Sequence, residues 1–527
     1  MADRGGRGRA WAMRALAPLA GAAAAFAQPP WGFLPGLLGY ALMLWLVDRS
    51  AGSRPLRSAF FRGWLTGVGY FVVSVWWIAE PFQIDAREQG WMAPFAVALV
   101  SMFMALFWGA AAAAYRVLAG RGAARVLVFA AAFCLAEWLR GHLLTGFPWD
   151  LAGETWRAGS ALSQAAALVG AYGLSWITVA AFSTPAVARE GRGGRVAVVL
   201  AALALAGLHA FGTMRLAGAP RANSTAPQIR VVQADVKQED KYDQALFANI
   251  VGRYTRLTAR PGARVPDIVV WPEGAIPAAL NEYLASGAWT RDAIVSALSP
   301  GQTLVLGGYR YGVDRSGRPV IYNSLAAVRR SGAGLAIAGV YDKFRLVPFG
   351  EFMPLDGVAA RLGIKQLVHV GDGFAAGPPP RPLRLVGLPT VQPLICYEAL
   401  YSGFTREGAR LAGRRAAWIV NISNDAWFGT ASGPRQHLNM ASYRAIEEGL
   451  PMVRATPTGV SAVIDAFGRV APGETLGEGA FGVIDAPLPP ALEPTPFDRW
   501  GDTAFWLMLA LSMAGARWRG RGRRADD

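Results

Sequence analysis

The chain has 527 residues, of which 53% are apolar and 17% are charged, against about 25% charged residues in ordinary soluble proteins. This composition excludes a disordered chain, and only two cysteines exclude a scaffold held together by disulfides. The formal net charge is nevertheless +16, because 52 Lys and Arg residues face 36 Asp and Glu residues. Such an excess is typical of nucleic-acid-binding proteins, so the position of the charges decides between classes of function.

Long apolar runs fill the first 215 residues, and one more lies near the C-terminus. They cover residues 15–47, 63–78, 89–115, 126–145, 158–188, 196–214 and 503–516. A helix that crosses a bilayer needs about 20 mainly apolar residues. Because Gln28-Pro29-Pro30 divides the first run, we expect a bundle of about seven spans over residues 1–217 and a C-terminal span over residues 500–518. The alternative, buried helices of a soluble domain, does not suit so many runs in succession.

Arginines concentrate in every second segment between these runs. The basic segments are residues 4–14, 49–62, 116–125, 189–195 and 517–524, whereas residues 29–30, 80–88 and 150–157 are neutral or acidic. Basic loops stay in the cytoplasm, so we expect both termini inside and residues 226–487 outside. That block carries a net charge of +5 and the remainder +11. The net charge therefore indicates membrane topology, and we expect no nucleic-acid partner.

The N-terminus has a second interpretation. An Arg-rich start, an Ala-rich core and the tripeptide Ala25-Phe26-Ala27 are also typical of a cleaved signal peptide. We favour a retained span because another apolar run follows at once. Cleavage would leave the rest of the topology unchanged.

The fifth expected span carries two charged residues near its outer end, Glu137 and Arg140. Charged side chains inside a membrane usually pair with each other, and we favour such a pair over contact with a lipid headgroup.

Between residues 226 and 487 the pattern changes to short β-branched runs that alternate with helix-like stretches. The runs lie at residues 229–233, 267–271, 303–307, 391–396 and 417–421, and helix-like stretches at 242–259 and 436–448. Strands that alternate with helices predict an α/β domain with α-β-β-α layers.

Three of the expected strands end on reactive side chains. Glu273 follows residues 267–271, Lys343 follows a strand that ends at Asp342, and Cys396 ends the run at 391–396. Residues at strand ends converge at one rim of a sheet, where the active sites of α/β proteins usually lie.

These three types of residue fit one reaction. Glu273 would accept the thiol proton, the Cys396 thiolate would attack an acyl carbonyl, and Lys343 would stabilise the oxyanion. Lys occurs four times against 48 Arg residues, so a lysine at 343 indicates a need for a compact ammonium. The alternatives are a surface ion pair for Lys343, a helix cap or a surface carboxylate for Glu273, and packing for Cys396 as for Cys134 in its apolar run.

Other arrangements compete with this one. A Cys–His–Asp set would use His437 with Asp425 beside Cys396. A transporter or structural membrane protein with an inactive domain is a different class, which the few charges in the spans and the complete set of three reactive residues disfavour. No cluster of metal ligands appears in the sequence, so we expect neither a metal nor another cofactor.

At these residues the chain resembles a known family. Glu, Lys and Cys at strand ends in this order, set in Trp271-Pro272-Glu273 and Asp342-Lys343, resemble the nitrilase superfamily of carbon–nitrogen hydrolases. With a helical bundle before this block and one span after it, nearly the full length resembles the apolipoprotein N-acyltransferase family. Residues 137–141, 145–149, 346–351 and 423–429 agree with that family.

The resemblance implies a two-step transfer at the periplasmic face of the bacterial inner membrane. Cys396 would take an acyl chain from a phospholipid, typically phosphatidylethanolamine, as a thioester. It would pass the chain to the α-amine of diacylglyceryl-cysteine on an apolipoprotein. The resemblance also implies that Glu351, Tyr397 and Glu398 support the site. Tyr242 stands where the family often has a Trp, which leaves its lipid or substrate contact open.

The alternative function is a membrane-anchored nitrilase-type amidase, which would pass the acyl group to water and would not need a bundle that faces lipid.

Overall fold

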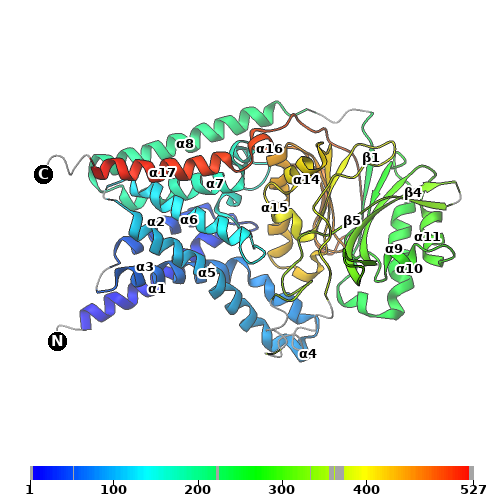
Figure 1. Cartoon of the computed structure of the whole chain (residues 1–527), viewed down its shortest axis with the longest axis horizontal. Coiled ribbons are helices and arrows are strands. Elements are labelled where there is room, and N and C mark those ends of the chain that lie inside the picture. The colour runs from blue at the N-terminus through cyan, green and yellow to red at the C-terminus, as the bar shows by residue number, and fades with distance from the viewer. Residues whose placement is uncertain are drawn as a thin grey trace. The chain divides into compact units, whose positions relative to one another are not determined.

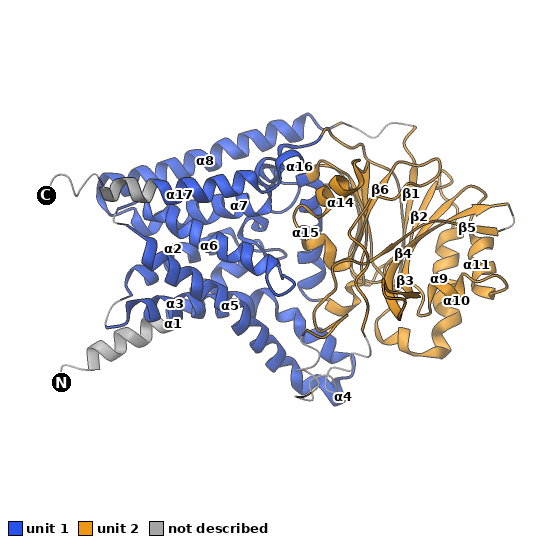
Figure 2. Ribbon diagram, viewed as in Figure 1, with its two compact units in different colours: residues 1–219, 431–447, 494–527 blue, residues 220–430, 448–493 orange. Residues whose placement is uncertain are grey.

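The computed structural model describes residues 4–50, 53–120, 122–220, 225–332, 334–354, 361 and 373–521 (Figure 1). The chain forms two compact units (Figure 2). Unit 1 comprises residues 1–219, 431–447 and 494–527, and unit 2 comprises residues 220–430 and 448–493.

Unit 1 is helical, and a helix lies over each apolar run. These helices are α1 (Arg4–Phe26), α2 (Gly39–Asp48), α3 (Pro55–Ser74), α5 (Ala93–Leu118), α6 (Arg125–His142), α7 (Ala166–Ser183), α8 (Gly191–Ala217) and α17 (Thr503–Arg521). Shorter elements connect them: η1 (Leu34–Leu38), η2 (Trp76–Gln83), α4 (Ala86–Gln89), η3 (Gly90–Met92), η4 (Ala152–Thr155), η5 (Leu162–Ala165), η6 (Thr184–Val187) and α16 (Pro496–Trp500).

By length and composition, fewer of these helices than expected can each cross a membrane. In the described part of the chain, Ala86–Leu118, Leu162–Val187 and Gly191–Ala217 qualify, and α3 with η2 would form a fourth span bent by 47°. Shorter apolar helices lie at Ala15–Phe26, Leu34–Asp48 and Thr503–Ala514. The charged side chains inside α6 lower its apolar character. About seven spans thus remain a prediction, and Arg121 and the arginines after Arg521 lie outside the described residues.

Small residues let neighbouring helices of unit 1 approach closely. A Cβ atom at Gly63 of α3 would lie 2.5 Å from the carbonyl oxygen of Trp108 in α5, and one at Gly67 would lie 2.9 Å from Ala105. A larger residue at either position would separate α3 from α5. Small residues are typical of helix contacts in membranes, where close backbone packing stabilises the pair.

The two charged residues of α6 form an ion pair. Nη2 of Arg140 lies 2.5 Å from Oε2 of Glu137, and Nε of Arg140 lies 3.0 Å from Oε1. The indole N–H of Trp108 donates to the same Oε1 at 2.9 Å. Both charged side chains are at most 2% exposed. The preferred interpretation, pairing rather than contact with a headgroup, agrees with this geometry.

Unit 2 contains two sheets. Their orders are β11-β1-β2-β3-β4-β5 and β10-β9-β8-β7-β6. The strands are β1 (Gln228–Ala234), β2 (Ile268–Val270), β3 (Thr303–Val313), β4 (Pro319–Ser331), β5 (Gly334–Asp342), β6 (Val391–Ile395), β7 (Trp418–Ile422), β8 (Met452–Ala455), β9 (Ser461–Ile464), β10 (Val470–Leu476) and β11 (Phe481–Pro487). Strands β1, β2 and β3 are parallel to one another, as are β6, β7 and β8. The other pairs are antiparallel.

Two cores arise from the alternation of side chains along these strands. One core joins the sheets and contains Val231 of the first sheet and Val420 of the second. The next residue along β1, Val232, points to the other face, where it packs with Ile250 and Ile294. This outer face is covered by α9 (Phe247–Ala259), α10 (Leu280–Tyr283) and α11 (Trp289–Ala297) (Figure 1). The other elements are η7 (Glu239–Tyr242), η8 (Gln244–Leu246), η9 (Cys396–Leu400), α14 (Phe404–Ala412) and η10 (Asp425–Phe428).

One helix of the expected α/β block has its contacts in unit 1. The helix is α15 (Gly433–Glu448), of which residues 433–447 group with the helical unit as part of the segment 431–447, so that the division differs from the expected block 226–487. The hydroxyl of Tyr443 donates to the carbonyl of Gly153 at 2.9 Å, and the amide of Asn439 donates to that of Glu154 at 2.8 Å. These polar contacts explain why the helix belongs with unit 1.

Candidate active site

Strand ends position the three expected residues within unit 2. Glu273 lies three residues beyond β2, Lys343 directly follows β5, and Cys396 directly follows β6. Gly307 of β3 makes room for the first of them, because a Cβ atom there would lie 2.6 Å from Cα of Glu273.

Lys343 lies between two carboxylates. Its Nζ is 2.9 Å from Oε1 of Glu351 and 3.4 Å from Oε1 of Glu273. All three residues are buried, with Lys343 only 1% exposed. Burial acts to lower the pKa of Lys343, but the charges of Glu273 and Glu351 outweigh it and raise this pKa above its ordinary value. The side chain is therefore a fixed ammonium.

Cys396 begins η9 in a strained backbone conformation, with φ at +49°. A non-glycine residue in the left-handed region is costly and is often found at functional sites. Burial, followed by the charge of Glu273, raises the pKa of the thiol to about 12, whereas Lys343 acts to lower it. Because a thiol with this pKa is protonated at neutral pH, it needs a neighbouring base to become a nucleophile. Glu273 is the carboxylate whose charge acts on it most strongly.

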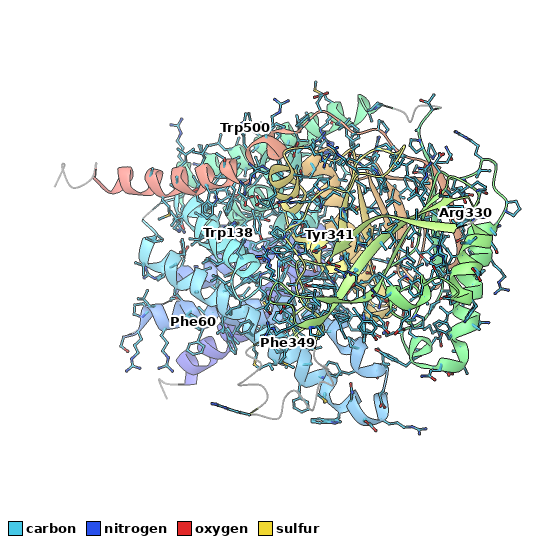
Figure 3. The ribbon with its side chains drawn as sticks, turned by 45° about the vertical axis from the view of Figure 1, so that its right-hand side comes forward. Phe60, Trp138, Arg330, Tyr341, Phe349 and Trp500 are labelled. Carbon is cyan, nitrogen blue, oxygen red and sulfur yellow. The ribbon has the colours of Figure 1, made fainter. Side chains whose placement is uncertain are left out.

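Glu351 is held by the loop that follows Lys343. Its Oε2 accepts a hydrogen bond from the backbone N–H of Val347 at 2.8 Å, which leaves Oε1 directed at Lys343. Phe349 in the same loop has φ at +63° and is exposed (Figure 3). The loop thus folds back on its own carboxylate and fixes one side of the ammonium.

Glu398 joins the segments that carry the lysine and the cysteine. Its Oε1 accepts hydrogen bonds from the hydroxyl of Tyr341 at 2.7 Å (Tyr341 is labelled in Figure 3) and from the backbone N–H of Phe344 at 2.8 Å. Its Oε2 accepts one from the N–H of Ile395, the residue before Cys396, at 2.8 Å. Burial raises the pKa of Glu398 to about 7, although these donors favour the ionised form. Glu398 therefore sets the distance between the two strand ends.

The two expected tyrosines differ in their surroundings. Tyr397 is buried and packs edge-on against Tyr401, with ring centroids 5.4 Å apart. Tyr242 is 65% exposed, and its hydroxyl accepts a hydrogen bond from Gln238 at 3.1 Å. Tyr242 therefore does not belong to the buried cluster formed by the other expected residues.

The two residues of the competing histidine arrangement belong to different units. Asp425 of unit 2 is paired with Arg454 at 2.7 Å, and both side chains are fully buried. His437 lies on α15, and its ring centroid is 5.8 Å from that of Trp149 in unit 1. Among the described residues, no group of His, Cys, Asp and Glu could hold a metal ion.

Two asparagines in the site were missing from the expected set. The side-chain amide of Asn323 donates to Oε1 of Glu273 and to Oε1 of Glu351, each at 2.6 Å. The backbone N–H of Asn424 donates to Oε2 of Glu273 at 2.7 Å, and its side-chain oxygen accepts from Lys241 at 3.2 Å. Asn424 follows β7, so a search for polar residues at the ends of expected strands could have found it. Asn323 lies inside β4, where no such pattern marks it.

Comparison with known proteins identifies two families in succession. Residues 20–183 match the apolipoprotein N-acyltransferase N-terminal domain, and residues 228–495 match the carbon–nitrogen hydrolase family. An amidase of the nitrilase superfamily from Nesterenkonia, of known structure, is 17% identical, with a TM-score of 0.34 over 50% of this chain and 93% of that chain.

Relatives match over nearly the whole length. The apolipoprotein N-acyltransferase of Caulobacter vibrioides is 55% identical over 96% of this chain and 94% of its own. Those of Rhodopseudomonas palustris and Bradyrhizobium diazoefficiens are 36% and 37% identical over 95% of this chain and 94% of theirs. The chain therefore belongs to the apolipoprotein N-acyltransferase family.

Proposed function

We propose that this chain transfers an acyl chain from a phospholipid, through a thioester on Cys396, to the N-terminal α-amine of a diacylglyceryl-cysteine on an apolipoprotein. The observation that carries the proposal is the buried ammonium of Lys343 between two carboxylates, within electrostatic reach of the thiol of Cys396. Phosphatidylethanolamine is the donor that we propose, from the family resemblance.

In the first step Glu273 accepts the proton of the Cys396 thiol, and the sulfur attacks the ester carbonyl of the donor. Lys343 stabilises the oxyanion. An ammonium has three donors, and the described residues take two of them, through Glu273 and Glu351. The third donor is free for the developing charge. The leaving alkoxide of the lysophospholipid then takes the proton from Glu273, which leaves an acyl thioester.

In the second step the α-amine attacks the thioester. Glu273 accepts a proton from the amine, and Cys396 leaves as a thiolate that recovers this proton. Because the lysophospholipid departs before the acceptor reacts, the kinetics are ping-pong. A covalent carrier is needed because both substrates are anchored in lipid and must use the same site in turn.

The supporting residues hold this arrangement. Glu351 keeps Lys343 charged and in place, and Glu398 holds the segments on either side of Lys343 and Cys396. Tyr397 follows Cys396 in η9 and is buried, and we assign the exposed ring of Tyr242 to contact with an acyl chain.

The alternation of arginines supports a location in the bacterial inner membrane. Both termini would lie in the cytoplasm, and the α/β unit would lie on the periplasmic side.

A transfer assay tests this proposal. The purified full chain is placed in vesicles of phosphatidylethanolamine with a labelled acyl chain, together with a peptide that begins with S-diacylglyceryl-cysteine. We expect the label on the α-amine of the peptide, with parallel lines in double-reciprocal plots of the two substrates. Label that appears only as free fatty acid would instead establish an amidase-like hydrolase, and intersecting lines would contradict the ping-pong order.

A further inference from the structure

The two carboxylate oxygens of Glu273 face different sheets. Oε1 accepts hydrogen bonds from Nδ2 of Asn323 at 2.6 Å and from Nζ of Lys343 at 3.4 Å; Asn323 lies in β4 of the first sheet and Lys343 directly follows β5 of the same sheet. Oε2 accepts one from the backbone N–H of Asn424 at 2.7 Å, just beyond the second sheet. The side chain therefore bridges the rims of both sheets.

A carboxylate oxygen has two lone pairs that can accept protons. Both lone pairs of Oε1 of Glu273 accept hydrogen bonds, whereas Oε2 accepts a single hydrogen bond from the described residues. Oε2 also lies toward the sheet that carries the thiol. Strands β6 and β7 are parallel neighbours whose last pair is Ile395 with Ile422, so Cys396 and Asn424 leave that sheet at the same rim.

Asn323 controls this asymmetry through three contacts. Its amide hydrogens go to Oε1 of Glu273 and Oε1 of Glu351, and its backbone carbonyl accepts from the N–H of Lys343 at 2.8 Å. An amide supplies two donors without adding charge. It can thus hold two carboxylates beside a single ammonium without neutralising the base.

We propose that Asn323 is a positioning residue. By donating a hydrogen bond to Oε1 of Glu273, it leaves Oε2 as the oxygen that accepts and releases the proton. The proton leaves the sulfur of Cys396 for Oε2 while the sulfur–carbon bond forms. It passes from Oε2 to the leaving oxygen while the carbon–oxygen bond of the donor breaks. The inference rests on the acyl transfer proposed above.

The charges around Glu273 predict how substitutions of Asn323 act. The titratable groups that interact with Glu273 are Lys343, Cys396 and Lys241, with Glu351 across the shared amide. Asn323→Asp removes both donors and adds a third negative charge, and both changes disfavour the carboxylate form of Glu273 that must accept the proton. Glu273 must be ionised to accept the thiol proton. The rising limb of the pH–rate profile, where the rate of adduct formation increases with pH, therefore moves to higher pH.

The test measures the rate at which the purified full chain forms its acyl adduct with phosphatidylethanolamine vesicles, from pH 5 to pH 9. We expect Asn323→Asp to lower the rate at pH 7 by about 100-fold, the lower end of what acid–base catalysis contributes, and Asn323→Ala by about 10-fold, because its effect on the base is only partial. Both variants should shift the rising limb upward, Asp further than Ala. Tyr322→Phe, which removes a hydrogen bond from the neighbouring residue of β4, should behave as the wild type.

The relative activities of the Asp and Ala variants distinguish a role of Asn323 in positioning Glu273 from a role in packing. A packing role predicts that the isosteric Asp retains more activity than Ala, with no shift of the limb, and that result would overturn the inference. Rates are compared per folded molecule, with heat unfolding as the measure, so that unstable protein does not count as lost chemistry. If the wild type forms no adduct, the proposed function itself fails. If it does and both variants match it, only the inference about Asn323 fails.

Discussion

In each unit a buried cation lies between two carboxylates, and we expect the two clusters to have different roles. In unit 1, Arg444 of α15 lies 3.2 Å from Glu154 and 2.8 Å from Glu447, and none of the three side chains is more than 2% exposed. In unit 2, Lys343 lies between Glu351 and Glu273 and is equally buried.

The partners of the carboxylates explain the difference. In unit 1, Glu447 also accepts from the backbone N–H of Ala171 at 2.8 Å, and Glu154 from that of Leu151 at 3.2 Å. The contacts of Arg444 with Glu154 and of Glu447 with Ala171 join α15 to other segments of the helical unit, so the planar guanidinium of Arg444 holds these segments together. In unit 2, Lys343 has one donor without a partner among the described residues, and its charge acts on a thiol. We therefore expect similar composition to support structure in one place and the proposed chemistry in the other.

Exchanging the cation at the chemical cluster should give the largest effect. Lys343→Arg keeps the positive charge but replaces the compact ammonium with a larger, planar guanidinium. Because the guanidinium cannot place an N–H group where the third ammonium hydrogen points, we expect no donor at the oxyanion. We expect the rate of adduct formation to fall by about 1,000-fold, as for the loss of a strong oxyanion donor. The heat-unfolding midpoint should change little. Full activity in this variant would refute the argument for a compact ammonium.

Removing the cation of the structural cluster should show the opposite pattern. Arg444→Met leaves two buried carboxylates without their partner and should lower the free energy of unfolding by about 3 kcal/mol. The measurement is the heat-unfolding midpoint of the purified chain, which should fall, while the rate of adduct formation per folded molecule is retained. A variant with unchanged stability but lost activity would show that the two clusters do not divide their roles in this way.

The smallest effect concerns the thiol itself. Since Glu273 raises the pKa of Cys396 and Lys343 lowers it, removing these charges should act in opposite directions. At pH 9, below the thiol pKa of about 12, Glu273→Gln should increase the thiolate fraction and Lys343→Met should decrease it. We expect changes of up to about tenfold for each unit of pKa, measured as the rate of alkylation of Cys396 by iodoacetamide. If both variants changed the alkylation rate in the same direction, access of the reagent to the thiol, and not the charge around it, would control its reactivity.

Much of the fold and the centre of the site could be predicted from local sequence. The lengths of the apolar runs predicted the helices of unit 1. The positions of Glu273, Lys343 and Cys396 at the ends of expected strands predicted that they form one group. These signals are short in range, because each depends only on a run and the residue that ends it.

The rest depends on contacts between distant segments. Asn323 reaches both carboxylates because β4 lies beside β5, with Ser324 opposite Asp342, and no local pattern reveals that register. The polar residues of α15 are equally typical of a soluble helix, so their contacts in unit 1 could not be inferred. The number of membrane spans stays a prediction for a similar reason, since buried ion pairs let a helix such as α6 carry charges.

The most direct test of the account is intact-protein mass spectrometry after incubation with phosphatidylethanolamine of one defined acyl chain. The account predicts the added mass of a single acyl group, located at Cys396 by peptide mapping and released by hydroxylamine. Cys396→Ala should abolish it, and Cys134→Ala, a change of the other buried cysteine, should retain it. Acyl transfer to the peptide by Cys396→Ala, or the absence of any adduct on an active wild type, would contradict the thioester mechanism.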